Sequence, residues 1–98
     1  MYFKIHESYR RVVAVCDSDL IGKKFEEGKM QLEVRENFYK DEEIDFENAI
    51  EFFKKEIAED ATFNIVGAES IKAAKESGVI SDGNVGEVAG IPFALRFV

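Results

Sequence analysis

The sequence has no tryptophan, and its 98 residues include only one cysteine, one histidine and one proline. A single cysteine excludes an internal disulfide, and one cysteine with one histidine cannot form a zinc site without carboxylates. No apolar run approaches the ~20 residues that a membrane-spanning helix needs. The N-terminal segment also lacks the apolar core of a signal peptide. These absences predict a cytoplasmic protein.

Basic residues are scarcer than acidic ones, and the formal net charge is −7. The imbalance is local, because residues 41–60 carry nine acidic and two basic side chains while the rest of the chain is nearly balanced. Phosphate binding depends on basic charge, so uniform attraction to nucleic acid is disfavoured. Apolar residues are abundant at 46%, with nine phenylalanines, which is enough for a packed core. A chain of this length forms one domain, residues 1–98.

Hydrophobic periodicity predicts an α+β fold with a mixed or mostly antiparallel sheet of about five strands and three helices. The predicted strands are residues 1–7, 10–17, 29–39, 61–66 and 91–98. The first two of them form a hairpin. The predicted helices are residues 17–28, an acidic amphipathic helix that Asp45 caps and that extends to residue 60, and a helix between Gly67 and Gly78.

Three glycines, Gly83, Gly86 and Gly90, precede the final strand. Their spacing is G-x-x-G-x-x-x-G, without the lysine of a phosphate-binding loop, and a strand rather than a helix follows them. We therefore predict turn geometry here rather than phosphate binding. The Gly67 turn is a better anion site, because the helix after it begins with free N–H groups. Glu69 in its first turn weakens that interpretation.

Other candidate chemistry is sparse. Cys16 and His6 fall on neighbouring strands, but nothing in the sequence orients the imidazole, and a buried cysteine behaves as a small hydrophobic residue. Asp17 and Asp19 could gather oxygen ligands with Glu7 or Glu26, yet helix capping explains both aspartates without an ion. We predict no catalytic residue, metal or cofactor from these patterns, and the sequence leaves enzymatic activity unsupported.

Local basic charge is found only in the N-terminal third of the chain. Arg10, Arg11, Lys23 and Lys24, together with tyrosines, could contact single-stranded RNA if they converge on one face. The alternative is an ordinary solvated surface whose cations pair with nearby glutamates.

Four stretches, "AVCDSDLIGKKFEEG", "LEVRENFY", "NIVGAESIKAAKESGVI" and "NVGEVAGIPFA", together resemble an uncharacterised archaeal family of about one hundred residues, a domain of unknown function. The resemblance spans nearly the whole chain and implies a single cytoplasmic α+β domain with no established activity. Family members often continue after the proline with His-Ala-Gln, where this chain has Phe93-Ala94-Leu95. A family activity that used that histidine would be lost here. The matched residues rank as a candidate ligand surface: Asp17, Gly22, Lys23, Asn64 and Gly67.

Taken together, these features favour a non-catalytic module that binds a protein or a small ligand. The alternative is an RNA- or ribosome-associated accessory protein that uses the N-terminal basic residues. Self-association is a further expectation, since the C-terminal strand could pair across a two-fold axis and form a homodimer.

Overall fold

The computed structural model describes residues 1–7 and 9–97. Its strands are β1 (Tyr2–Glu7), β2 (Arg11–Cys16), β3 (Lys24–Glu27), β4 (Met30–Glu33), β5 (Glu42–Glu43), β6 (Thr62–Val66), β7 (Val85–Val88) and β8 (Ile91–Arg96). Its helices are α1 (Glu36–Tyr39), α2 (Phe46–Ala58) and α3 (Ala68–Ser77), with short 3-10 helices at Ser18–Leu20 and Asp82–Asn84.

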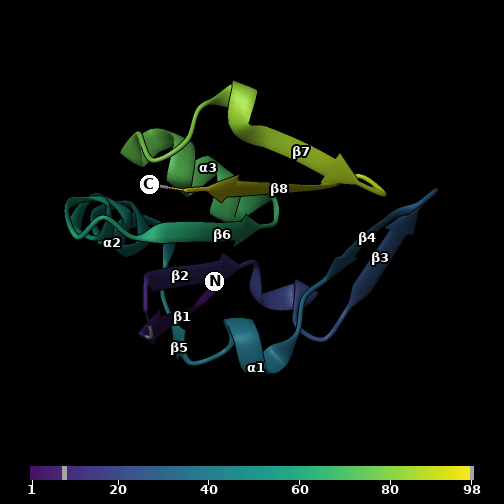
Figure 1. The fold of residues 1–98 in the computed structure, drawn as a ribbon, viewed down its shortest axis with the longest axis horizontal. Coiled ribbons are helices and arrows are strands. Elements are labelled where there is room, and N and C mark those ends of the chain that lie inside the picture. Colours follow the sequence, from purple (N-terminus) through teal and green to yellow (C-terminus); the bar gives the residue numbers. More distant parts are fainter. Residues whose placement is uncertain (8, 98) are drawn as a thin grey trace.

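The described residues form a six-stranded sheet in the order β5-β1-β2-β6-β8-β7, and a separate two-stranded sheet of β3 and β4. Only β2 and β6 run parallel among the neighbours in the large sheet, so the sheet is mixed and mostly antiparallel. The predicted fold class is confirmed, with a sheet larger than predicted. Figure 1 shows these strands stacked from β1 to β7, and the hairpin of β3 and β4 reaching to the turn between β7 and β8.

Each face of the large sheet packs against a different set of elements. One face places Val13, Phe63 and Ile65 against α2 and α3, and Phe53 of α2 lies with its ring centroid 5.8 Å from that of Phe63. The other face packs Ala14, Cys16 and Val66 against α1 and the β3–β4 hairpin. Because side chains alternate along a strand, neighbouring residues of β2 and β6 belong to opposite cores.

Several predicted elements form because local signals and packing agree. The hairpin of β1 and β2 is confirmed, with Tyr2 opposite Cys16 and His6 opposite Val12. Asp45 caps α2 by accepting a hydrogen bond from the N–H of Asn48 at 2.8 Å. Gly78 ends α3 in the left-handed conformation, with φ 86°.

The helix predicted over residues 17–28 is wrong, and the strand predicted over 29–39 is confirmed only for Met30–Glu33, which is β4. The chain instead makes a 3-10 turn, a β-hairpin and the short helix α1. Phe25 pairs with Leu32 across the hairpin, and the two-residue loop begins with Gly28 at φ 60°. A glycine at the first position of a two-residue loop is a hairpin signal, and the reading of Phe25 as part of a helical stripe obscured it.

The glycine-rich segment before β8 forms a turn as predicted, although it also contains strand β7. Ala89 and Gly90 both have positive φ, 51° and 80°, which suits the tight loop between β7 and β8. Gly86 lies within β7 opposite Phe93, where a β-carbon would come within 2.8 Å of the phenyl ring. The strand β7 was missed because its four residues depend on pairing with β8.

Candidate functional site

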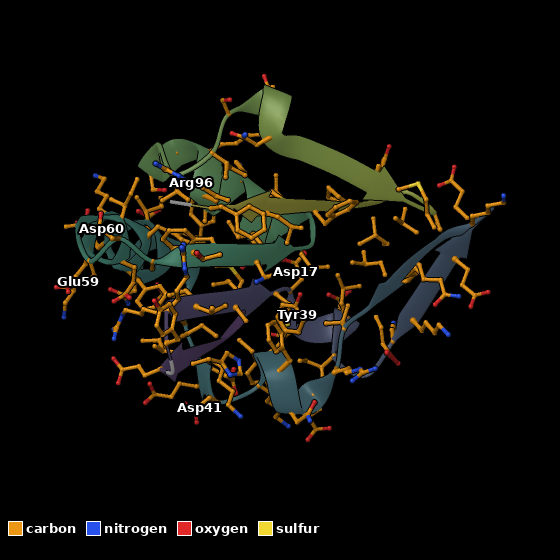
Figure 2. The ribbon with its side chains drawn as sticks, in the orientation of Figure 1. Asp17, Tyr39, Asp41, Glu59, Asp60 and Arg96 are labelled. Atoms are coloured by element: carbon orange, nitrogen blue, oxygen red, sulfur yellow. The ribbon has the colours of Figure 1, made fainter. Side chains whose placement is uncertain are left out.

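Asp17, which is labelled in Figure 2, directly follows the last residue of β2 and lies beside the start of α3. Its carboxylate accepts hydrogen bonds from the N–H of Glu69 at 3.1 Å, the N–H of Ser70 at 2.8 Å and the hydroxyl of Ser70 at 2.8 Å. Its own N–H donates to the carbonyl of Val66 at 3.0 Å. The start of α3 is therefore occupied by an anion that the chain itself supplies.

Gly67 fits tightly against this carboxylate. It has φ 109° and ψ 153°, and a β-carbon there would lie 2.6 Å from both carboxylate oxygens of Asp17. Its N–H donates to the carbonyl of Pro92 at 2.9 Å. Asp17 and Gly67 are thus brought together, in an internal cap that joins β2, β6, β8 and α3. The 3-10 turn after Asp17, by contrast, has no side-chain cap, so the aspartate caps a distant helix rather than the next one.

The other three residues of the predicted ligand surface lie elsewhere. Gly22 and Lys23 belong to the link before β3. The N–H of Gly22 donates to the carbonyl of Val34 at 2.7 Å, and the N–H of Val34 donates to the carbonyl of Lys23 at 2.9 Å. These hydrogen bonds hold the two ends of the β3–β4 hairpin together. Asn64 lies in the middle of β6, paired with Ala14 of β2 and Leu95 of β8. The five candidates therefore occupy three separate places.

Asn64 belongs to a part of the sheet that is exposed to solvent. Within residues 1–7 and 9–97, its side-chain amide forms no hydrogen bond, and the residue is half-buried. Leu95 lies directly opposite Asn64 and is 47% exposed, and Phe97 two positions further is 72% exposed. Alternation and pairing place Asn64 and Leu95 on the face opposite α2 and α3, and Phe97 directly follows the end of β8. We call Asn64, Leu95 and Phe97 the open face.

Sequence reasoning missed Leu95 and Phe97 as surface residues. The alternating pattern of the final segment puts Phe93, Leu95 and Phe97 on one side and Ala94 and Arg96 on the other. Because both faces of the sheet pack against a core and Phe93 belongs to the second of these cores, this pattern by itself does not mark Leu95 as exposed.

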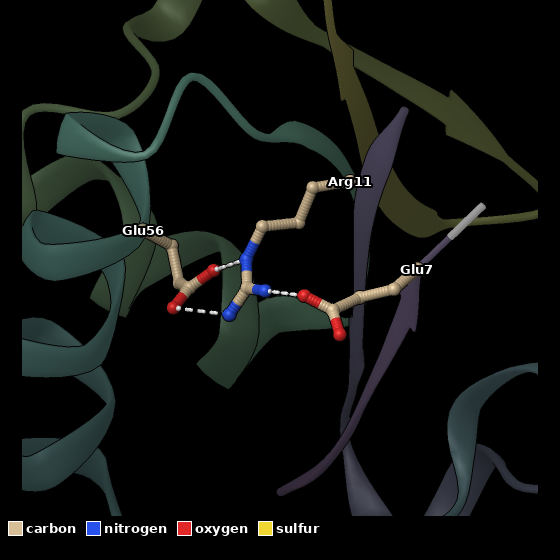
Figure 3. A network of polar contacts seen from close by, with 3 residues as sticks. All are labelled: Glu7, Arg11 and Glu56. Atoms are coloured by element: carbon tan, nitrogen blue, oxygen red, sulfur yellow. Dashed lines mark hydrogen bonds and ion pairs between the residues drawn. The ribbon is translucent and has the colours of Figure 1, made fainter. Parts of the chain in front are cut away.

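The four basic residues do not form one surface. Arg10 and Arg11 lie at the beginning of β2, whereas Lys23 and Lys24 follow its end. Arg11 forms two ion pairs: its Nε donates to the carboxylate of Glu56 at 2.6 Å, and its guanidinium also pairs with the carboxylate of Glu7 (Figure 3). The hydrogen bond to Glu56 raises the pKa of Arg11 above its usual value. Lys24 lies 3.4 Å from a carboxylate oxygen of Glu26. The convergence that RNA contact requires is not present among them.

Cys16 and His6 do not form a pair, because they lie at opposite ends of the hairpin register. His6 stacks on Phe38 with ring centroids 4.5 Å apart, and its Nε2 lies 2.8 Å from the Phe38 carbonyl oxygen. A cavity of about 330 Å³ adjoins His6 and is lined also by Glu33, Arg35, Asn37 and Tyr39. Cys16 is 0% exposed, and burial raises the pKa of its thiol to about 12.

This burial predicts an alkaline loss of stability. The pKa of the Cys16 thiol rises from 9.0 in the unfolded chain to about 12 in the folded protein. The contribution of the thiol to the free energy of unfolding is therefore complete below pH 9 and is lost as the pH rises toward 12. Tyr39, whose burial raises its pKa to about 12, acts in the same direction above pH 10. Between pH 9 and 10 we expect the free energy of unfolding to fall by up to about 1.4 kcal/mol through Cys16. Urea unfolding at pH 8, 9 and 10 measures it.

The variant Cys16→Ala is the control for this prediction. It is less stable overall because it leaves a cavity, but its stability should change less between pH 9 and 10. Equal pH dependence in both proteins would contradict the assignment to the thiol.

Residues 1–7 and 9–97 contain neither a metal-binding cluster nor a membrane-spanning helix. No group of three His, Cys, Asp or Glu side chains there lies close enough to hold a metal ion. No helix in the same residues is both long and apolar enough to cross a membrane.

A family model described as protein of unknown function (DUF424) matches residues 6–98. A crystal structure of an uncharacterized conserved protein from Methanopyrus kandleri is similar, with a TM-score of 0.86 and 22% identity over 97% of this chain and 88% of that chain. That likeness shows the fold alone. No curated protein matches significantly. The resemblance seen in the sequence is confirmed, and because the family model spans nearly the whole chain, this protein belongs to the DUF424 family.

Proposed function

We propose that this chain is a non-catalytic protein-binding module whose contact surface is the open face. One observation carries the proposal: two large apolar side chains near the end of the chain, Leu95 and Phe97, are 47% and 72% exposed, and Leu95 is paired with Asn64, whose amide has no partner within the described residues. Exposed apolar side chains that gather beside polar groups mark contact surfaces in soluble proteins.

The position of Asn64 supports this function. Its neighbours along β6, Phe63 and Ile65, are fully buried, so the strand is central to the core. Asparagine is disfavoured within strands, and a β-branched residue would serve the sheet better. An amide offers both donors and an acceptor, so it can bond the main chain of a partner laid across the strands. The amide therefore suits recognition more than folding.

A protein partner fits this surface better than a small molecule does. Small ligands bind in concave cavities, whereas protein interfaces combine an apolar centre with polar groups around it. Asn64 and Leu95 belong to adjacent paired strands and form part of a sheet surface. Three cavities of the molecule are lined by other residues.

The proposal is tested with the double variant Leu95→Lys/Phe97→Lys. A photoreactive phenylalanine analogue at position 95 should crosslink one defined partner in lysate of the source organism, and the tagged double variant should fail to capture that partner. The matched control is Tyr9→Lys, because Tyr9 is an aromatic residue that is 99% exposed and lies outside the sheet. It should capture the partner as the wild type does.

Circular dichroism and thermal melting establish that each variant is folded before the comparison. Equal capture by the double variant and the wild type would contradict the proposal. A second copy of this chain as the crosslinked partner would instead assign the open face to a homodimer. In such a dimer only the last residues of β8 could extend the sheet, because β6 pairs with one edge of β8 and β7 pairs with the other edge over Ile91–Ala94.

A further inference from the structure

Two adjoining hollows lie between the start of α2 and the start of α3, on the side of the large sheet opposite the open face. One, of about 430 Å³, is lined by Phe46, Ala68, Glu69 and Lys72. The other, of about 390 Å³, shares Phe46 and Glu69 and is lined also by Met1 and by the residues just before α2. The two hollows share two lining residues, and we call them together the Phe46 groove.

The floor of the Phe46 groove is apolar and aromatic. The ring of Phe46 is half-buried, and the ammonium of Lys72 lies 5.6 Å from its centroid. A cation at this distance is attracted by the electron-rich face of the ring. The ring can thus support the aliphatic and cationic parts of a basic side chain. The ammonium of Lys72 holds this position in the free protein, so a ligand cation must displace it to lie over the ring.

The rim of the groove is acidic. Glu43, Asp45 and Glu69 line it, and neither Glu43 nor Glu69 has an ion-pair partner within residues 1–7 and 9–97. Asp45 is occupied by its bonds to Asn48 at the start of α2. The adjoining segment 41–60 carries nine acidic and two basic residues, so the field at the groove attracts cations.

The spacing of these carboxylates favours an extended ligand over a single ion. No three acidic, histidine or cysteine side chains of the described chain are close enough to hold a metal. We infer that the Phe46 groove binds an extended basic peptide segment of a partner protein. One arginine or lysine of that segment displaces Lys72 from over the Phe46 ring, and its charged group lies between Glu43 and Glu69. This surface is separate from the open face, so it does not depend on the function proposed above.

The test uses a fluorescein-labelled peptide of alternating arginine and alanine, titrated against the whole chain and followed by anisotropy at 0.15 M salt. The variant Glu43→Gln/Glu69→Gln should weaken binding about tenfold, since one exposed ion pair is worth up to about a factor of five. The control Glu76→Gln/Glu87→Gln removes the same charge from exposed residues outside the groove, and it should bind as the wild type does. A peptide with glutamine in place of arginine should not bind.

The variant Phe46→Leu separates the ring from the charges, because leucine keeps the apolar packing and removes the aromatic face. It should weaken the arginine peptide a few-fold, as expected for a cation over a ring. Equal weakening by the two double-glutamine variants would mean diffuse attraction to an acidic protein and would overturn the inference. Absence of binding to the wild type would also overturn it. Binding of spermidine without binding of the peptide would assign the groove to polyamines instead.

Discussion

Replacing Gly67 with alanine is expected to destabilise the protein by about 3 to 5 kcal/mol. The backbone at φ 109° and ψ 153° is accessible almost only to glycine, and the added carbon would lie 2.6 Å from the carboxylate oxygens of Asp17. To avoid this clash the carboxylate must leave the start of α3, which breaks its hydrogen bonds to Glu69 and Ser70. Urea unfolding gives the loss as a shift of the midpoint.

Gly78→Ala is the matched control, because Gly78 also has positive φ but has open space where a β-carbon would be placed. It should cost only about 1 to 2 kcal/mol, the penalty of the backbone conformation by itself. A cycle with Asp17→Ala adds a second check: the cost of Gly67→Ala should be smaller when the carboxylate is already gone. If Gly67→Ala costs no more stability than Gly78→Ala, then the carboxylate of Asp17 is not the reason that position 67 requires glycine.

The second large effect is expected at the ion pair between Arg11 and Glu56. Glu56 on α2 is 2% exposed, and Arg11 on β2 contacts it through Nε at 2.6 Å and a second nitrogen at 3.2 Å (Figure 3). Arg11→Ala would leave a buried carboxylate without its partner, which costs about 3 kcal/mol or more. The free energy of unfolding, from chemical denaturation, measures this.

Two further variants separate a lost partner from lost packing. Arg11→Met/Glu56→Leu replaces the pair with apolar side chains of similar size and should recover most of the stability. Lys54→Ala removes one member of the exposed pair with Glu51, whose atoms are 3.6 Å apart, and should change the stability by about 0.5 kcal/mol at most. A double variant no more stable than Arg11→Ala would show that the loss comes from packing of the arginine stem.

Some elements could be predicted because their signals are local. In α2, Phe46, Ala49 and Phe53 recur at helical spacing, and Asp45 precedes them as a cap. The β1–β2 hairpin follows from two β-rich segments with a short link. In each case the residues that decide the element lie within a few positions of one another, so a single stretch of sequence contains the whole signal.

The helix predicted over residues 17–28 was wrong because the local sequence pattern fits more than one structure. Leu20, Ile21 and Phe25 fit a helical stripe, but they also fit a turn followed by a strand that packs on the second face of the sheet. Phe25 has its partner, Leu32, on the next strand, and the packing of this hairpin on the large sheet decides between the two. Local periodicity contains no record of that packing.

The candidate surfaces divide in the same way. Asp17, Asn64 and Gly67 stood out in the sequence, and the acidic charge of residues 41–60 was plain. The sequence did not show which of them face solvent, because the carboxylate of Asp17 has its hydrogen-bond partners 52 and 53 residues away, at Glu69 and Ser70. The distant partner turns a candidate anion site into an internal cap.

By itself, the sequence determined an α+β fold with an amphipathic helix inside a strongly acidic segment, residues 41–60, and an apolar final strand. Only the tertiary structure decided that Asp17 closes α3, that Arg11 is held by Glu56, and that Leu95 and Phe97 remain exposed. The physical reason is the order and register of the strands. They bring distant segments into contact and leave part of one sheet face uncovered by helices, and neither depends on the spacing of residues within one segment.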